Sequence, residues 1–97
     1  MIFAYADIRK IIIPDSVTSI GDYAFDHCVY LTDITLPKNL KEIGFEAFKN
    51  CNDLKEIEIP ESVAAIGENA FEGCDEIKII MPPSSVIGID KVNIKNE

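Results

Sequence analysis

Three cysteines are the residues of this 97-residue chain with the most reactive side chains, and they are evenly spaced. Cys28, Cys51 and Cys74 occupy the same position in successive 23-residue units. Zinc sites combine cysteines at short spacings such as Cys-x-x-Cys, which this pattern does not provide. On neighbouring parallel strands, stacked Cβ atoms would lie ~4.8 Å apart, beyond the ~3.5–4.5 Å of a disulfide. We therefore expect a column of buried reduced thiols, with a disulfide as the alternative.

Carboxylates and a single histidine are the other groups that could do chemistry. Asp33, Glu56 and Glu58 could hold a divalent cation, which prefers oxygen ligands. No motif organises these carboxylates, so a solvated acidic face is the favoured interpretation. His27 has no serine or cysteine nucleophile in a predictable arrangement nearby, which predicts a surface residue. The sequence therefore predicts no cofactor, no metal and no enzymatic activity.

The same period extends well beyond the cysteines. Proline recurs at positions 14, 37, 60 and 83, and each of three units also carries an Ile-Gly pair and an Ala-Phe pair. A fixed period of about 20–50 residues is typical of solenoids, in which each repeat buries its apolar face against its neighbours. The pairs in the three units are Ile20-Gly21 and Ala24-Phe25, Ile43-Gly44 and Ala47-Phe48, and Ile66-Gly67 and Ala70-Phe71.

The first half of each unit has the pattern of a strand. In the middle unit Ile34 and Leu36 alternate with Asp33 and Thr35, which indicates a strand with one buried face. Pro37 lacks an amide donor and is expected to end this strand.

The second half of the unit is expected to turn the chain back. A second short strand is predicted near Ile43, followed by Gly44 in a backbone conformation that disfavours a side chain. Residues 46–49 suit one turn of α- or 3-10 helix. Ala47 would let neighbouring repeats approach closely, and Phe48 would fill the centre of the repeat.

The spacing Cys51-x-x-Leu54-x-x-Ile57-x-Ile59-Pro60 resembles a leucine-rich repeat. With the 23-residue length, Ile-Gly after the proline and Ala-Phe-x-x-Cys, the chain is similar to BspA-like (Treponema pallidum-type) leucine-rich repeats, from Ile11 to Ile79. The resemblance implies an α/β fold: a right-handed solenoid with a parallel concave sheet, and helical or 3-10 turns and short second strands on the convex side. It also implies a non-enzymatic protein–protein interaction module, as in surface or adhesion proteins that engage host or matrix proteins.

We expect one domain, residues 1–97, with altered repeats at both ends. Residues 1–10 form a partial N-terminal repeat and 11–79 the three full repeats, while 80–97 form a degenerate repeat or cap, with a frayed tail as the alternative. One period before the first full repeat, Ile2 falls at the phenylalanine position, Tyr5 at the cysteine position and Ile8 at the leucine position.

Composition limits the partners. A net charge of −8 argues against nucleic acid, which needs a basic surface, and no polybasic or long apolar stretch indicates membrane docking or insertion. The segment from Met1 to Asp7 lacks the features of a signal peptide. The protein is therefore cytoplasmic if the chain is complete, and exported if the chain is a fragment of a longer protein.

The outward positions of the predicted concave strands define an interaction surface for a protein partner of unknown identity. They form two columns, Lys10–Asp33–Glu56–Ile79 and Ile12–Thr35–Glu58–Met81. Exposed apolar residues on the outer strands (Ile12, Ile79 and Met81) predict self-association through a sheet edge, through these residues or through the ends of the solenoid. The alternative is that terminal segments cover them.

Size and aromatic residues add two further expectations. Four strands at ~4.8 Å span only ~15 Å, whereas a standard interface needs ~800 Å² per partner, a patch ~28 Å on a side. Binding would therefore need a longer array, an oligomer or the convex side as well. On that side Tyr23 and Tyr30 flank His27 and form either an aromatic contact patch or ordinary packing.

Overall fold

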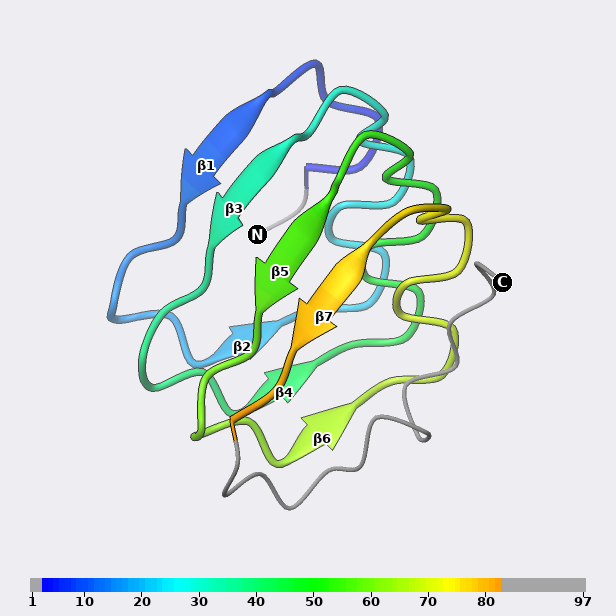
Figure 1. Cartoon of the computed structure of the whole chain (residues 1–97). Helices are drawn as coiled ribbons and strands as arrows, with labels where there is room; N and C mark the ends of the chain where they lie inside the picture. The colour runs from blue at the N-terminus through cyan, green and yellow to red at the C-terminus, as the bar shows by residue number, and fades with distance from the viewer. Residues whose placement is uncertain (1–2, 83–97) are drawn as a thin grey trace.

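The computed structural model describes residues 3–82, which form a stack of short parallel strands (Figure 1). The longer strands β1, β3, β5 and β7 lie side by side on one face of the fold, and the shorter strands β2, β4 and β6 lie along another. The chain visits these two faces in turn, once in each repeat. The strands are β1 (Lys10–Ile12), β2 (Ser19–Ile20), β3 (Asp33–Thr35), β4 (Glu42–Ile43), β5 (Glu56–Glu58), β6 (Ala65–Ile66) and β7 (Lys78–Ile80).

A column of stacked phenylalanine rings fills the interior, as the repeat pattern predicted. Phe25, Phe48 and Phe71 are fully buried. The Phe48 ring lies 5.1 Å from that of Phe25 and 5.4 Å from that of Phe71, and both pairs are close to parallel. Burial of this aromatic surface is a large apolar contribution to stability.

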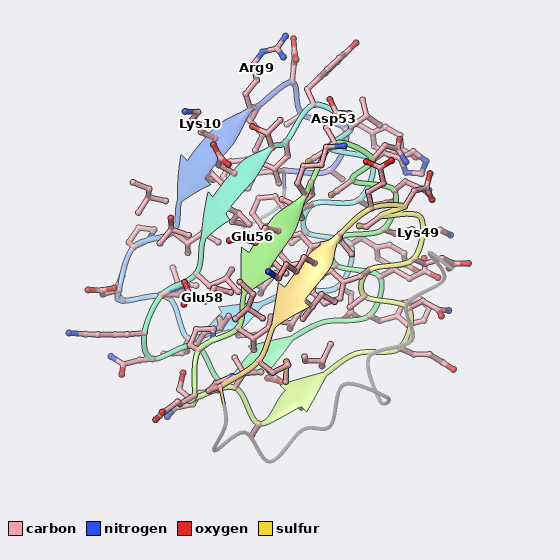
Figure 2. The ribbon with its side chains drawn as sticks, in the orientation of Figure 1. Arg9, Lys10, Lys49, Asp53, Glu56 and Glu58 are labelled. Atoms are coloured by element: carbon pink, nitrogen blue, oxygen red, sulfur yellow. The ribbon has the colours of Figure 1, made fainter. Side chains whose placement is uncertain are left out.

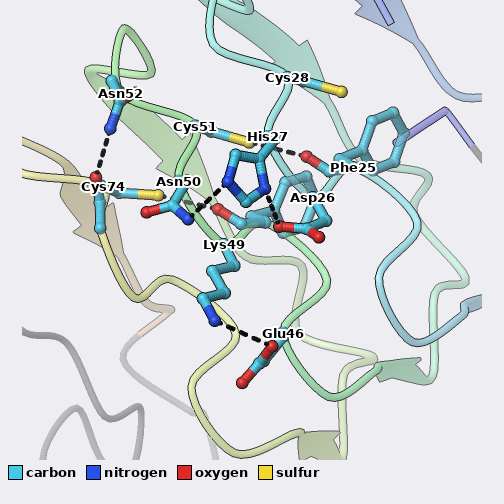
Figure 3. Close-up of polar contacts among 12 residues, drawn as sticks. Phe25, Asp26, His27, Cys28, Glu46, Lys49, Asn50, Cys51, Asn52 and Cys74 are labelled. Carbon is cyan, nitrogen blue, oxygen red and sulfur yellow. Dashed lines mark hydrogen bonds and ion pairs between the residues drawn. The ribbon is translucent and has the colours of Figure 1, made fainter. Parts of the chain in front are cut away.

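The three cysteines form the predicted column of buried reduced thiols. Each thiol donates a hydrogen bond to the carbonyl oxygen of a phenylalanine in the preceding repeat, as Figure 3 shows for Cys51 and Cys74. Every buried thiol therefore has an acceptor, which removes the cost of burying an unpaired polar group. The pairs are Cys28 with Phe3 (3.0 Å), Cys51 with Phe25 (3.1 Å) and Cys74 with Phe48 (3.1 Å).

These thiols are expected to be unreactive in the folded protein. Burial raises the pKa of Cys28, and the neighbouring Cys74 thiol together with burial raises the pKa of Cys51. At about pH 8 iodoacetamide should alkylate the folded protein ~100-fold more slowly than the unfolded protein, as followed by mass spectrometry. The unfolded Cys28 thiol loses its proton near pH ~8.5 while the folded thiol keeps it, so Cys28 should lower the free energy of unfolding as pH rises above that value. Equal alkylation rates in the folded and unfolded states would contradict the burial of the thiols.

The predicted helical turns are wrong: residues 3–82 contain strands and turns but no helix. A right-handed helix needs negative φ at every residue, and the turn segment of each repeat contains left-handed residues. In the second turn segment Glu46 has a φ of 51° and Asn50 a φ of 61°. The described part of the chain is therefore all-β rather than α/β.

Alternate backbone amides of each turn segment bond to the next repeat, and the amides between them bond within the turn. The N–H groups of Glu46, Phe48 and Asn50 donate to carbonyl oxygens of the next repeat at 3.1, 2.8 and 2.7 Å. Because alternate amides are used in this way, they are not available for the i to i−4 bonds of an α-helix. The turn side of the fold is thus held by its own ladder of inter-repeat hydrogen bonds.

The glycine after each second strand was expected to need an unusual backbone angle, and this expectation is also wrong. Among the described glycines only Gly73 has a positive φ. Gly44 is required by close approach instead, since a Cβ atom there would lie 2.6 Å from the backbone nitrogen of Asp22. The second strands themselves are confirmed, and they form one parallel sheet in the order β2-β4-β6.

The expected single sheet on the other face is divided in two. β1 pairs with β3 and β5 pairs with β7, but no ladder of hydrogen bonds joins β3 to β5. The two pairs also differ in register. Ile11 pairs with Ile34, at the full repeat period, whereas Ile57 pairs with Ile79, one position short of that period. The shift in register therefore lies between β5 and β7, next to the break.

The N-terminal segment is likewise one residue out of the predicted register. The Phe3 ring stacks on Phe25 with centroids 5.4 Å apart, and the Ala6 N–H donates to the Phe3 carbonyl as Cys28 does to Phe25. Phe3 and Ala6 therefore occupy the phenylalanine and cysteine positions expected for Ile2 and Tyr5. The segment between the cysteine and leucine positions is one residue shorter here than in the full repeats. Ile2 itself lies outside the described residues, and so does the predicted C-terminal cap (residues 80–97) from residue 83 onward.

Candidate interaction surfaces

The outward side of β1, β3, β5 and β7, here named the strand face, carries most of the residues predicted for binding. Asp33, Thr35, Glu56 and Glu58 are exposed there, and Figure 2 shows Glu56 and Glu58 on β5. Thr35 and Glu58 each lie between two buried residues of the chain, which hold them in place. Ile12 is 77% exposed, the most exposed large apolar side chain of the described residues.

Ile79 and Met81 do not belong to the strand face, contrary to the sequence prediction. Because β7 is shifted by one position from the repeat period, Ile79 lies beside buried Ile57, and both Ile79 and Met81 pack against the core. Lys78 and Ile80 take the outward positions, beside Glu56 and Glu58. The prediction assumed the same repeat period for every strand, and β7 departs from it.

The corrected register gives the strand face an acidic centre with a lysine on each side. Lys10 on β1 lies 3.6 Å from Asp33 on β3, and both side chains are exposed. Lys78 lies beside Glu56 at the other end of the face. The acidic centre of the strand face is therefore flanked by one lysine on each outer strand. Exposed pairs of this kind add little to stability.

A groove of about 360 Å³ opens at the carboxyl ends of β3 and β5. It lies where no hydrogen-bond ladder joins these strands. Leu36, Ile59 and Pro60 contribute apolar surface, and Lys38 and Glu61 contribute charge. Such a groove suits the side chain of a partner better than a drug-sized ligand, since small-molecule sites are usually enclosed.

His27 lies in a small polar cluster on the turn side (Figure 3). Its Nδ1 lies 2.7 Å from the Asp26 carboxylate and its Nε2 lies 3.1 Å from the Asn50 amide nitrogen. Since a carboxylate only accepts, Nδ1–H donates to Asp26 and Nε2 accepts from Asn50. Tyr5 stacks on the imidazole with centroids 4.6 Å apart. Both ring nitrogens of His27 are thus occupied, and the cluster links three successive repeats.

The predicted aromatic patch around His27 has a different composition. Tyr23 packs edge-on against Phe45 with centroids 5.5 Å apart, and the Tyr30 ring lies 5.2 Å from the Arg9 guanidinium carbon. The aromatic partner of His27 is Tyr5. Sequence reasoning missed this contact because Tyr5 had been placed one residue out of register.

Metal binding and membrane insertion receive no support from the described residues. No group of three His, Cys, Asp or Glu side chains within residues 3–82 is arranged to hold a metal ion. The same part of the chain has no helix that is long and apolar enough to cross a bilayer.

The family model for BspA type leucine rich repeat regions matches residues 1–96, in six copies. The chain belongs to this BspA-type leucine-rich repeat family. No curated protein matches it.

Solved structures of bacterial leucine-rich repeat proteins are similar to this chain. A Treponema pallidum leucine-rich repeat protein is 37% identical over 69% of this chain and 32% of its own, with a TM-score of 0.67. A leucine-rich cell surface protein of Faecalibacterium prausnitzii is 35% identical over 81% of this chain and 20% of its own, with a TM-score of 0.74. A Bacteroides capillosus leucine-rich repeat protein is 37% identical over 82% of this chain and 58% of its own, with a TM-score of 0.70. This BspA-type chain therefore matches less than two thirds of each of these proteins.

Proposed function

We propose that this chain is a non-enzymatic protein-interaction module that binds its partner through the strand face. The observation that carries the proposal is the row of exposed side chains Ile12, Asp33, Thr35, Glu56 and Glu58 on a backbone fixed by stacked repeats. Rigid outward positions of this kind hold side chains ready for recognition without an ordering cost. We further propose that residues 1–97 form one domain and that its repeats wind as a right-handed solenoid.

The charge pattern favours a partner with a basic centre. Glu56 and Glu58 lie in the middle of the strand face, and Lys78 is the nearest outward cation on β7. A partner that presents lysine or arginine to these carboxylates would gain complementary charge and faster association. Membership of the family and similarity to a protein described as a leucine-rich cell surface protein support an interaction role.

A role in binding rather than catalysis is supported by the reactive groups themselves. The thiols of Cys28, Cys51 and Cys74 are buried and donate to carbonyl oxygens. His27 has both ring nitrogens in hydrogen bonds. A catalytic base needs a nitrogen within reach of a substrate proton, and this histidine does not offer one.

Selection from a displayed library of random peptides on the immobilised protein tests the strand face directly. We expect selected peptides to be rich in lysine and arginine, and to lose about tenfold in affinity, measured by calorimetry, when Glu56→Lys is introduced. Glu68→Lys, at an exposed position on the turn side, is the matched control and should leave affinity unchanged. Equal losses in the two variants would refute binding through the strand face.

We also propose self-association through an end of the stack as a second function. Partly buried apolar side chains packed against the core occur only in the first and last repeats of the described residues. They are Phe3, Ala6, Ile8, Ile11 and Val17 at one end, and Ile66, Ile79 and Met81 at the other. A second copy that covered one end would bury such side chains fully, at ~25 cal/mol for each Å² removed from water.

A further inference from the structure

The N-terminal end of the stack presents an unfinished rung of backbone hydrogen bonds. In the second repeat the N–H groups of Lys41 and Gly44 donate to the carbonyl oxygens of Thr18 and Ile20, at 2.7 and 2.8 Å. The equivalent donors of the first repeat are the N–H groups of Thr18 and Gly21. Neither of these has an acceptor among residues 3–82. An open strand edge of this kind is a template for pairing with another chain.

The glycine at position 21 indicates that another backbone approaches this edge closely. A Cβ atom at Gly44 would clash with the backbone of Gly21 and Asp22, and one at Gly67 would clash with the backbone of Gly44 and Phe45. These two glycines are required because the preceding repeat passes so close. At Gly21 nothing lies within 4 Å of the equivalent position, and its φ is not positive. No contact within the described residues requires glycine at this position. A second chain stacked on the N-terminal end would require it, because its backbone would pass close to Gly21.

The size of the end face is sufficient for a stable dimer. The molecule measures 33 × 33 × 19 Å. Four strands at ~4.8 Å span ~15 Å, so the shortest dimension is the stacking direction. The end face therefore measures about 33 Å on each side, whereas ~28 Å on a side gives the ~800 Å² per partner of a standard interface. The strand face, limited to 19 Å in one direction, falls short of that area.

Charge distinguishes the N-terminal end from the opposite one. Residues 3–20 carry two carboxylates, Asp7 and Asp15, and two cations, Arg9 and Lys10, and so have no net charge. Residues 67–82 carry four carboxylates and one lysine, a net charge of −3. Two N-terminal ends can meet without net repulsion, although each whole chain carries −8.

From these observations we infer that two copies of the chain pair N-terminal end to N-terminal end around a two-fold axis. β1 lies antiparallel to β1 of the second copy, and β2 antiparallel to β2 of the second copy. This arrangement gives acceptors to the N–H groups of Thr18 and Gly21, which have none among residues 3–82, and places the second backbone against Gly21. An isologous interface of this type closes on itself and stops at a dimer. The inference rests on the proposed self-association and specifies its end, its symmetry and its contacts.

The arrangement has a consequence for partner binding. A two-fold axis perpendicular to the strand face keeps both strand faces on the same side of the dimer. Eight strands then lie side by side and span ~34 Å instead of ~15 Å. The doubled face exceeds the ~28 Å needed for a standard interface, so the dimer supplies the area that a single copy lacks.

Sedimentation equilibrium of the full 97-residue chain, from low to high micromolar concentration, tests the inference. The wild type should reach a limit at twice the 10.8 kDa monomer mass. Gly21→Val should raise the dimer dissociation constant at least about tenfold, because its side chain blocks the close approach. Thermal unfolding should show that the fold tolerates this change, since the space at Gly21 is empty. Ala65→Val, at an exposed position of β6, is the matched control and should dimerise normally.

The outcomes separate the inference from the broader proposal. A wild type that stays monomeric at every concentration overturns both the dimer and the proposed self-association. A dimer that Gly21→Val leaves intact overturns only the N-terminal site. Growth beyond a dimer with rising concentration contradicts the two-fold arrangement, because it requires the two different ends to meet.

Discussion

Phe48→Ala is expected to lower the free energy of unfolding by roughly 3–5 kcal/mol. The Phe48 ring is fully buried between the rings of Phe25 and Phe71. Removing it leaves a cavity that the neighbouring repeats cannot fill, because their backbones are tied together by hydrogen bonds on the turn side. A small domain has only ~5–15 kcal/mol in total, so the variant should lose a large part of its stability. Urea denaturation followed by circular dichroism gives the value.

Glu58→Ala is the control for this experiment. Its side chain is exposed on the strand face, so its loss should change stability by less than ~0.5 kcal/mol. A loss below ~1 kcal/mol for Phe48→Ala, with the control behaving as stated, would show that the phenylalanine column is not the core.

Gly67→Ala is expected to cost ~3 kcal/mol, at the upper end of the usual range for overpacking. The new Cβ atom would collide with backbone atoms of Gly44 and Phe45. Unlike a flexible side chain, this backbone cannot rotate away, so the two repeats would have to separate. Denaturation midpoints of the wild type and the variant provide the measurement.

The same substitution at the three equivalent glycines forms an internal series. Gly44→Ala should be as costly as Gly67→Ala, since its Cβ would lie 2.6 Å from the Asp22 backbone nitrogen. Gly21→Ala should be close to neutral in the monomer, where the space is empty. If all three variants lost the same stability, the glycines would be acting through backbone conformation rather than close approach.

The interior of the fold could be predicted from the sequence because its residues repeat in kind and position. Phe25, Phe48 and Phe71 with Cys28 and Cys51 keep one spacing, and large apolar side chains at a fixed period can be buried only by stacking. The structure places all of them in the core. The second strands and the strand ends near the prolines followed from the same pattern.

The register of the last strand could not be predicted in this way. Ile79, Ile80 and Met81 are three apolar residues in a row. Alternation of apolar and polar residues therefore does not say which of them points inward, and a slip of one residue exchanges the two faces of a strand. The resulting error moved Ile79 and Met81 onto the strand face and left out Lys78 and Ile80. At the N-terminus a shortened segment caused the corresponding error for Tyr5.

The turn segments show a second limit of sequence reasoning. Residues 46–49 have a composition that suits a helical turn. The amides of Glu46 and Phe48 instead bond to the next repeat, and Glu46 and Asn50 adopt left-handed angles. These contacts join residues that are nearly one full repeat apart, so no local pattern reveals them. Local propensity was overridden by the hydrogen bonds between repeats.

The size of the binding surface connects the fold to its proposed function. A single strand face is limited by the 19 Å dimension of the stack, and this is smaller than a standard interface requires. Pairing at the N-terminal end doubles the face without any new repeat. The claim that the open end formed by Thr18 and Gly21 is an interface is therefore central to the account.

Amide hydrogen exchange at two protein concentrations tests that claim most directly. At high concentration the N–H groups of Thr18 and Gly21 should become protected, approaching the protection of Lys41 and Gly44, which are bonded within the chain. On dilution Thr18 and Gly21 should lose that protection while Lys41 and Gly44 keep it. Exchange of Thr18 and Gly21 at the rate of unprotected amides, at every concentration, would contradict the interface.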